Sequence, residues 1–458
     1  MTIIFTRIRS LLTFLLAIFY LSNLVIKSDQ ISHIIPVILV LLVGFCIPTI
    51  TGSSRIIGYA IFAAGIALLV IYNAPLNVWI ESLEKNLYIV VILILVPLLK
   101  IPIQQGGYFS ALKTFFPHYV NSSSRFYLLS GIITSFIGMM INIAVMPLLD
   151  EISKATKYHT DKKLLTTAIS RGFAACIIWA PTMAAPILIL QLTDISWPQY
   201  FPYAAACAAL VFLVGYFMNK YEYRGELPAA SADDTVDIKQ ADYRKIIELC
   251  LFVIILIASI SLIAVIWEIS TFTVVSFAAL IFPVIWMAII KHLPMLFNEV
   301  KENYYCQSLP RLNNEIVLFV GAGLLAGGIT YSNLGDYVPY ILQMLVGNNV
   351  LLLTIAIMFG TLFVSALGVH PIVTTVIIGE TINFAAYGIS PVYMALLLSV
   401  SWTLGIIISP ASATIITLSG LTGRSPVKAG LHWNGLYVLI SSACFIAFVT
   451  ILRLLNLL

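Results

Sequence analysis

The stretch IIWAP at residues 177–181 is matched by IIISP at residues 406–410, at an offset of 406 − 177 = 229. Downstream, LTDIS at 192–196 is matched by LTGRS at 421–425 with the same offset, 421 − 192 = 229. Apolar sequences also match by accident, which is the alternative interpretation of each pair. Ordered pairs at a constant offset favour a chain made of two related halves.

Two further pairs extend the match toward the start of each half. Pro147 corresponds to Pro371 (371 − 147 = 224), and PLL at 97–99 corresponds to GLL at 323–325 (323 − 97 = 226). We therefore expect five parts in the chain. They are N-terminal scaffold helices (1–86), a first repeat (87–218), a flexible cytoplasmic linker rich in small and acidic residues (219–246), further scaffold helices (247–311) and a second repeat (312–458).

Loop charge differs between the two halves. The 112 residues from Leu312 to Gly423 contain no lysine or arginine, where an even spread of the chain's 24 basic residues would place about six. The earlier half carries Lys100, Lys113, Arg125, Lys154, Lys157, Lys162, Lys163 and Arg171. Because basic loops stay on the cytoplasmic side of a membrane, the two halves are expected in opposite orientations. Such an inverted repeat is typical of secondary transporters.

The composition is that of a membrane protein. Hydrophobic residues make up 60% of the chain and charged residues 10%, with a mean hydropathy of +1.02. No basic cluster interleaved with aromatic residues suggests a nucleic-acid partner, so the net charge of +4 is assigned to cytoplasmic loops. The six cysteines lack the spacing of a metal site or a disulfide framework.

Thirteen apolar segments are long enough to enter a bilayer. They lie near residues 11–26, 34–50, 56–72, 87–103, 126–149, 172–193, 201–218, 247–267, 271–290, 314–331, 350–378, 392–421 and 433–452. Segment 126–149 has basic residues on both flanks, and segment 350–378 has none on either flank. We interpret both as re-entrant hairpins, the first opening to the cytoplasm and the second to the outside. The expected fold is an all-α integral membrane protein with about 11 transmembrane helices plus two re-entrant hairpins in an inverted repeat.

This topology places the N-terminus in the cytoplasm and the C-terminus outside. The compact loops suggest a multi-pass protein of the cell inner (plasma) membrane. The first apolar run lacks a small-residue cleavage site, so it is interpreted as a retained helix rather than a signal peptide.

Candidate site residues lie where apolar segments are interrupted, because bare backbone groups are tolerated at membrane depth only beside a cavity. Each half has a proline-containing helix break that would free carbonyls for a cation and amides for an anion. The helix-break residues are Pro181, Pro186 and Pro410, and the hydroxyls beside them are Thr182, Ser409, Ser412 and Thr414. The alternative is a plain proline kink whose hydroxyls bond back to their own helix.

The hairpin tips supply the remaining candidates. They are Gly138 and Asn142 in the first hairpin, and Ser365, Gly368 and His370 in the second. His370 could bind solute or carry a coupling proton, or could be a neutral imidazole bonded within its hairpin. Asp150 and Glu380 are expected as solvated hairpin ends, with gating salt bridges as the alternative, and no basic residue is expected at membrane depth beside the tips. An anion would then rely on amide dipoles and hydroxyls.

The order of segments in each half is a helix, a hairpin, a proline-interrupted helix and a closing helix. This order resembles the ion transporter superfamily, particularly the divalent anion–sodium symporters, the arsenite efflux pumps and the large permease of tripartite periplasmic carriers. The resemblance covers roughly residues 87–218 and 312–452. It implies a homodimer that works by an elevator movement of the hairpin-bearing domain.

The site motifs match this superfamily in part. The symporters carry a Ser-Asn-Thr signature at both hairpin tips, whereas this chain has FIGM at 136–139 and FVSAL at 363–367, so that only Ser365 falls on the signature. The Thr/Pro-rich break that follows is better matched, by Pro181-Thr182 and by SPAS at 409–412. The departure concerns sodium coupling and dicarboxylate binding more than the architecture.

The preferred hypothesis is a secondary active transporter of a small, carboxylate-type anionic solute, coupled to Na⁺ or H⁺ and without a cofactor. A proton-coupled efflux carrier or cation/proton antiporter is the alternative. A polytopic membrane enzyme is disfavoured, because the sequence shows neither paired carboxylates nor a nucleophile–base pair in short loops. The sequence leaves open the solute, the coupling ion and the direction of transport.

Overall fold

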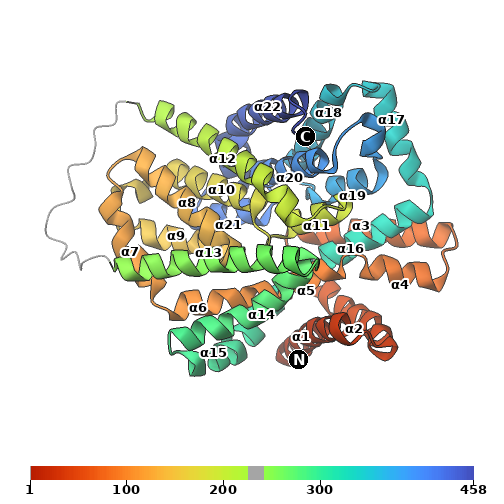
Figure 1. Cartoon of the computed structure of the whole chain (residues 1–458), viewed down its shortest axis with the longest axis horizontal. Helices are drawn as coiled ribbons and strands as arrows, with labels where there is room; N and C mark the ends of the chain where they lie inside the picture. The colour runs from red at the N-terminus through yellow and green to blue at the C-terminus, as the bar shows by residue number, and fades with distance from the viewer. Residues whose placement is uncertain (1, 225–241) are drawn as a thin grey trace. The chain divides into compact units, whose positions relative to one another are not determined.

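The computed structural model describes residues 2–224 and 242–458, which form α-helices with short 3-10 and π turns (Figure 1). No strand occurs in either range. Eleven helical stretches are long and apolar enough to cross a membrane. The prediction of an all-α membrane protein is confirmed.

The eleven stretches differ in part from the crossings that the sequence predicts. Ser123–Ser153, expected as a hairpin, is one of the eleven by length and composition, whereas Arg55–Ile71, expected as a crossing, is shorter. The segment expected as a loop after residue 331 contains an additional helix, α17 (Tyr337–Val346). Ten residues are too few to stand out as a spanning segment, which is why the apolar pattern did not reveal it.

The described chain divides into two compact units. Unit 1 is formed by residues 1–102, 263–348 and 372–383, and unit 2 by residues 103–262, 349–371 and 384–458. The helices of unit 1 are α1 (Thr2–Ile26), α2 (Asp29–Cys46), α3 (Ser53–Ile71), α4 (Leu76–Glu84), α5 (Leu87–Leu95), α14 (Thr271–Ile289), α15 (Leu293–Glu299), α16 (Asn313–Tyr331), α17 and α19 (Ile372–Thr381). Those of unit 2 are α7 (Tyr108–Tyr119), α8 (Ser123–Ile141), α9 (Val145–Ser153), α10 (Lys162–Trp179), α11 (Ala184–Thr193), α12 (Trp197–Glu222), most of α13 (Tyr243–Ile266), α18 (Val350–Ala366), α20 (Pro391–Ile408), α21 (Ala413–Thr422) and α22 (Trp433–Leu454). The chain first passes from unit 1 to unit 2 within helix α6 (Lys100–Gln105), between Pro102 and Ile103.

Unit 1 is built around α16, which packs against α3 and α4. Glycines permit the close approach of these helices: a Cβ added at Gly65 would lie 2.9 Å from backbone atoms of Leu324. Small residues at a helix interface let two backbones come together in a membrane protein, where there is no hydrophobic drive between helices.

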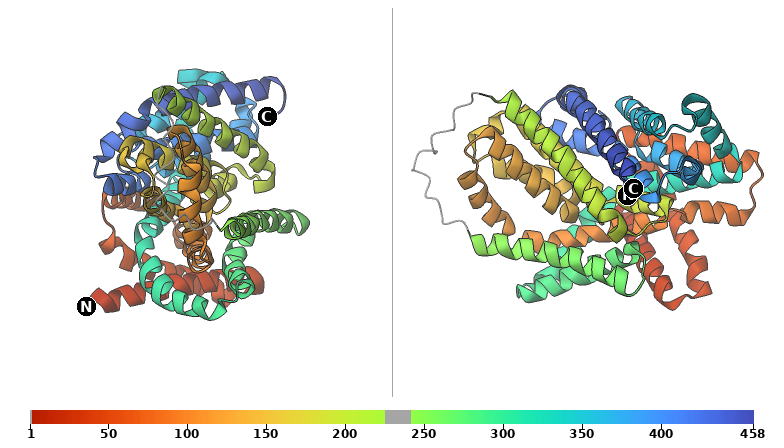
Figure 2. Two further views of the ribbon diagram at one scale, coloured as in Figure 1. Left: turned by 90° about the vertical axis from the view of Figure 1, so that its left-hand side faces the viewer. Right: turned by 45° about the horizontal axis from the view of Figure 1, so that its top comes forward.

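Unit 2 is built around α10, which packs against α8, α12 and α20. Figures 1 and 2 show α12 running alongside α8 and α10. Gly131 of α8 and Gly172 of α10 make the crossing close, because a Cβ at Gly172 would lie 2.5 Å from the Cα of Gly131.

The two predicted halves repeat the same elements. Helices α10 and α20 each have 18 residues, and they begin and end 229 residues apart (391 − 162 and 408 − 179). Helices α11 and α21 each have ten residues, again 229 apart (413 − 184 and 422 − 193). This is the offset of the sequence match.

Residues with positive φ recur at nearly the same offsets. The pairs are Gly107 and Asn333 (333 − 107 = 226), Asn142 and Gly368 (368 − 142 = 226), and Asp194 and Gly423 (423 − 194 = 229). Positive φ is uncommon outside glycine, so its recurrence at equivalent turns is a strong mark of duplication. The opposite membrane orientation of the halves stays a prediction.

The first predicted hairpin returns toward its starting point. The hydroxyl of Tyr158, which follows α9, donates to the carbonyl of Asn121, which precedes α8, over 2.9 Å. The rings of Phe126 and Tyr158 have centroids 5.9 Å apart. The two ends of segment 126–149 therefore lie together, as in a re-entrant hairpin.

Different loops meet at the two ends of α12. At one end, Lys163 pairs with Glu222 at the C-terminus of α12, and Tyr223 donates to Asp161. At the other end of α12, the hydroxyl of Tyr203 donates to the carbonyl of Leu457 over 3.1 Å. The basic loop before α10 and the start of the predicted linker thus share one end, opposite Leu457.

The predicted linker, residues 219–246, overlaps the end of α12 and the start of α13. Its residues 225–241 lie outside the described residues.

Candidate functional site

Two broken helices cross inside unit 2. The first consists of α10 and α11 with a break at residues 180–183, and the second of α20 and α21 with a break at residues 409–412. Helix α10 packs against both α20 and α21, and α20 packs against both α10 and α11. Helix α10 therefore touches both pieces of the second broken helix, and α20 touches both pieces of the first. The candidate site lies at this crossing.

At the first break, the carbonyls that end α10 are already bonded. The indole N–H of Trp197 donates to the carbonyl of Trp179 over 2.9 Å, and the hydroxyl of Tyr200 donates to the carbonyl of Ile178 over 2.6 Å. Both donors are fully buried residues of α12. These carbonyls are closed to a cation.

The amides at the first break are more open. Helix α11 starts after Met183 without a side-chain cap. The hydroxyl of Thr182 does not cap it and instead donates to the carbonyl of Met139 near the end of α8. Pro186, in the first turn of α11, has no N–H. The break therefore presents the uncapped, positive end of a helix dipole.

The second break reverses this arrangement. The hydroxyl of Ser412 accepts from the amide of Ile415 over 3.2 Å, and that of Ser409 accepts from the amide of Ala411 over 3.4 Å. The amides here are capped, as expected for Ser at a helix N-terminus. Thr414 is buried in the first turn of α21.

The carbonyls of the second break have no equivalent of the α12 donors. The offset of 229 takes Trp197 to Pro426 and Tyr200 to Ala429, and neither side chain can donate a hydrogen bond. Gly430 packs there instead: a Cβ on it would lie 2.9 Å from the carbonyl oxygen of Ile408. Within the described ranges, no side chain donates to the carbonyls of Ile407 or Ile408.

The second hairpin tip lies against this break. Gly368 has φ +97° and lies in the turn after α18, and a Cβ on it would touch Ala411 at 3.5 Å. Ser365 is fully buried, and its hydroxyl has no hydrogen-bond partner among the described residues. A Cβ on Gly405 of α20 would lie 2.7 Å from that hydroxyl, so Ser365 faces the last turns before the break. The ring of His370 meets that of Trp402 edge-on at 5.5 Å.

The first hairpin tip is different. Asn142 has φ +53°, ends α8 and is partly exposed. The turn after it packs against α21. Gly138 is a packing residue, because a Cβ on it would meet Phe173 at 3.3 Å. The structure thus brings Ser365, Gly368, Ser409 and Pro410 together, whereas Gly138 lies in a helix contact.

Arg171 is a buried residue that the sequence analysis did not single out. Its side chain lies within α10, donates to the Asn434 amide oxygen over 3.0 Å and to the Trp433 carbonyl over 3.1 Å, and stacks on Tyr437 at 4.4 Å. Arg171 is therefore a buried basic residue inside unit 2, and the expectation that no basic residue lies at membrane depth beside the hairpin tips stays a prediction. The missed signal was Asp161, an N-cap that starts α10 at Lys162 and so places Arg171 in the interior of the helix.

The two carboxylates expected at solvated hairpin ends are also paired. Asp150 lies 3.0 Å from Nε2 of His159 in unit 2, and Glu380 lies 2.8 Å from Nζ of Lys85 in unit 1. The carboxylate side chains are only 12% and 15% exposed. The expectation of solvated ends is wrong, because each hairpin's second arm packs onto a basic neighbour.

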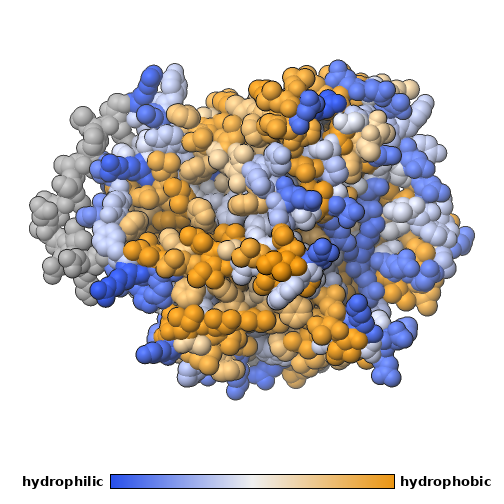
Figure 3. Space-filling model, in the orientation of Figure 1, coloured by the Kyte–Doolittle hydropathy of each residue, from blue (hydrophilic) through white to orange (hydrophobic). Residues whose placement is uncertain are grey.

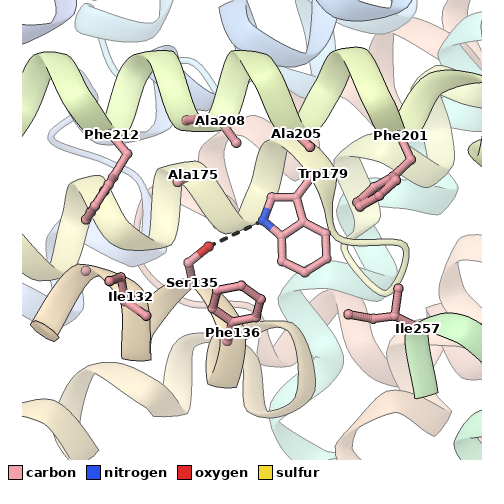
Figure 4. Close-up of a pocket in the computed structure, with 12 residues that line it drawn as sticks. Ile132, Ser135, Phe136, Ala175, Trp179, Phe201, Ala205, Ala208, Phe212 and Ile257 are labelled. Atoms are coloured by element: carbon pink, nitrogen blue, oxygen red, sulfur yellow. Dashed lines mark hydrogen bonds between the residues drawn. The ribbon is translucent and has the colours of Figure 1, made fainter. Parts of the chain in front are cut away.

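A cavity of about 280 Å³ lies beside the first break, between α8, α10, α12 and α13 (Figure 4). Trp179, the last residue of α10, points into it, and its indole N–H donates to the Ser135 hydroxyl over 3.3 Å. This cavity and the second break are separate features of unit 2.

No protein-family model and no curated protein matches this chain. Among solved structures, the chain is similar to the Alcanivorax borkumensis YdaH transporter, with a TM-score of 0.56 and 15% identity over 80% of this chain and 85% of that one. It is also similar to Neisseria gonorrhoeae MtrF, described within a class of antimetabolite efflux pumps, with a TM-score of 0.52 and 16% identity over 77% and 80% of the two chains. This chain has the fold of solved membrane transporters. The resemblance to the ion transporter superfamily stays a prediction.

Proposed function

We propose that this chain is a secondary active transporter of a small anionic solute, coupled to Na⁺ or H⁺. The observation that carries the proposal is the opposite chemistry of the two helix breaks. The first presents uncapped amides and closed carbonyls, and the second presents capped amides and carbonyls without side-chain donors. One crossing thus offers a donor site and an acceptor site.

The first break suits an anion. The start of α11 supplies backbone N–H groups and the positive end of a helix dipole, which together favour a carboxylate or a similar group. Arg171, in the same broken helix, adds a permanent positive charge, and the partners described for it above are neutral acceptors and the ring of Tyr437. Its field extends through a medium of low dielectric, where charges interact strongly.

The second break suits the coupling cation. The carbonyls of Ile407 and Ile408 and the hydroxyl of Ser365 are oxygen ligands of the kind that hold Na⁺ at unwound transporter helices. An anion bound at the first break and a cation at the second would each reduce the cost of burying the other's charge. This mutual stabilisation is the physical basis of coupled binding.

Transport would follow an elevator-type alternating-access movement of the hairpin-bearing part, in a homodimer in the cell inner membrane with the N-terminus in the cytoplasm. Substrate and ion would bind together and cross together.

The efflux alternative is favoured by one specific observation: MtrF, which shares the fold, is described as an antimetabolite efflux pump. In that case His370, beside Trp402 at the second tip, would carry the coupling proton. Replacing it by Gln should then remove the pH dependence of transport in proteoliposomes. Unchanged pH dependence in a folded His370→Gln variant would exclude this version.

The main test is thermal unfolding of the detergent-purified protein against carboxylates, amino acids and inorganic anions, with and without Na⁺. A ligand that binds only the folded state raises the melting temperature. We expect one anion class to raise it, and more so with Na⁺. In Ser365→Ala the Na⁺ dependence should be lost, whereas Ser259→Ala, whose hydroxyl bonds back to its own helix at Leu256, should retain it. If an anion raises the melting temperature of the parent protein equally with and without Na⁺, sodium coupling is refuted. If no anion raises the melting temperature, the anionic substrate is refuted.

A further inference from the structure

The cavity beside Trp179 is formed by an unusual pairing of small and large side chains. Gly131, Ala175 and Ala208 are among the small residues that open the space, and Phe136, Phe201 and Phe212 are among the aromatic residues that wall it (Figure 4). Protein interiors normally fill such spaces to crystal-like density. A pocket of this kind between helices is a typical place for a ligand.

The lining of the cavity excludes a charged ligand. None of the 12 residues that line it is ionisable. Its hydrogen bond between Trp179 and Ser135 pairs the two side chains with each other. A carboxylate would therefore lose its hydration without gaining a partner, which is strongly unfavourable. The solute proposed for the helix breaks does not fit here.

The mouth of the cavity opens among residues suited to hydrocarbon. Ile132 and Phe136 of α8 are 44% and 46% exposed. Helix α13, which contributes Ile257 to the lining, exposes Ile254 and Ile255 at 60% and 51%. The surface over α13 is predominantly hydrophobic (Figure 3). Helices α8, α12 and α13 are all candidate membrane spans, so the medium outside the mouth is the bilayer core.

We propose that this cavity binds the hydrocarbon chain of a membrane lipid. The occupant is apolar because the lining is apolar, and it comes from the bilayer because the mouth opens between spanning helices. The chain would contact the indole of Trp179, whose backbone carbonyl is held by Trp197 at the first break. A bound lipid would thus support the end of α10, independently of which solute the breaks bind.

The test uses Trp179 as its own reporter, in the full-length protein reconstituted into phosphatidylcholine vesicles. Bromine atoms on the lipid acyl chains quench a tryptophan that they contact, and the difference between the parent and Trp179→Phe isolates the signal of Trp179. We expect Trp179 to be quenched by acyl-brominated lipid. Ala205→Leu, which fills the cavity, should reduce that quenching by at least half. Ala206→Leu, one residue along α12 on its exposed side, should leave it unchanged.

Phospholipid retained by the detergent-purified protein, measured by native mass spectrometry, gives a second readout that does not depend on Trp179→Phe being folded. Ala205→Leu should retain at least twofold less lipid than Ala206→Leu. Protection of Trp179 from brominated lipid would overturn the proposal and indicate that a protein segment, such as a second copy of the chain, fills the cavity. Equal quenching and equal lipid retention in the two alanine variants would overturn it as well.

Discussion

Single side chains decide which backbone groups the two helix breaks expose. Trp197 and Tyr200 donate to the carbonyls of the first break, and their counterparts at an offset of 229, Pro426 and Ala429, leave those of the second without a side-chain donor. For the carbonyls, the difference between the two halves therefore lies in two residues of α12, whereas for the amides it lies in the breaks themselves, where Ser412 stands in place of Met183.

Tyr200→Phe is expected to destabilise the protein. The buried carbonyl of Ile178 would lose its donor, at a cost of about 1–3 kcal/mol. A lower melting temperature in detergent measures this effect. The matched control is Tyr203→Phe, one turn along the same helix, whose hydroxyl bond to Leu457 is exposed. Equal melting temperatures for the two variants would show that the Tyr200 hydroxyl does not close the break.

Arg171→Lys is expected to behave as a non-conservative change. A lysine cannot keep both hydrogen bonds and the stacking on Tyr437, so we expect a loss of about 1–3 kcal/mol in the free energy of unfolding. Arg424→Lys, at an exposed position, should change stability by less than about 0.5 kcal/mol. Thermal unfolding of both variants checks this prediction, and an unaffected Arg171→Lys protein would contradict it.

At the scale of elements, helix contacts rest on glycines placed at crossings. Gly131 and Gly172 bring α8 against α10, and this contact sets the position of the first hairpin relative to the first break. The bond from Thr182 to Met139 joins the same two elements near the tip. A hairpin attached in this way has a fixed position against its broken helix.

Gly172→Ala is expected to separate α8 from α10. The added Cβ would lie 2.5 Å from the Cα of Gly131, and backbone must move, which costs about 1–3 kcal/mol. Gly360→Ala in α18 is the control, because nothing lies within 4 Å of its Cβ position. It should be neutral or stabilising by about 0.4–1 kcal/mol. Melting temperatures that fall equally in both variants would contradict the packing role of Gly172.

At the scale of the whole molecule, the open question is the sidedness of the two halves. The contact of Tyr158 with Asn121 brings the ends of the first hairpin together, and Lys163, from the basic loop before α10, lies at the end of α12 away from Leu457. The positive-inside rule then assigns that end to the cytoplasm.

Single cysteines test this assignment in intact cells. Introduced at Ser122 and Thr160, both should resist a membrane-impermeant thiol reagent. Introduced at Asn348 and Tyr387, both should react. Opposite labelling of Ser122 and Thr160, or of Asn348 and Tyr387, would show a full crossing and refute the inverted repeat.

Local sequence patterns were enough to predict the membrane environment, the helical class and the duplication. Hydropathy and charge are local properties of the chain, and the offset of 229 appears unchanged in the bounds of α10, α11, α20 and α21. The sequence also located the breaks, because proline and small residues occur together at equivalent positions of the two halves, whereas single prolines such as Pro36 and Pro283 lie inside continuous helices.

Which groups at those breaks have a hydrogen-bond partner depends instead on how the helices pack against one another. The partners that close the first break come from α12, the partners of Arg171 come from α22, and the cavity beside Trp179 is made by four different helices. The sequence places Arg171 near a basic loop, yet packing buries it. A hydrogen bond between helices depends on their crossing and rotation, which follow from the packing of the whole bundle and from no local pattern.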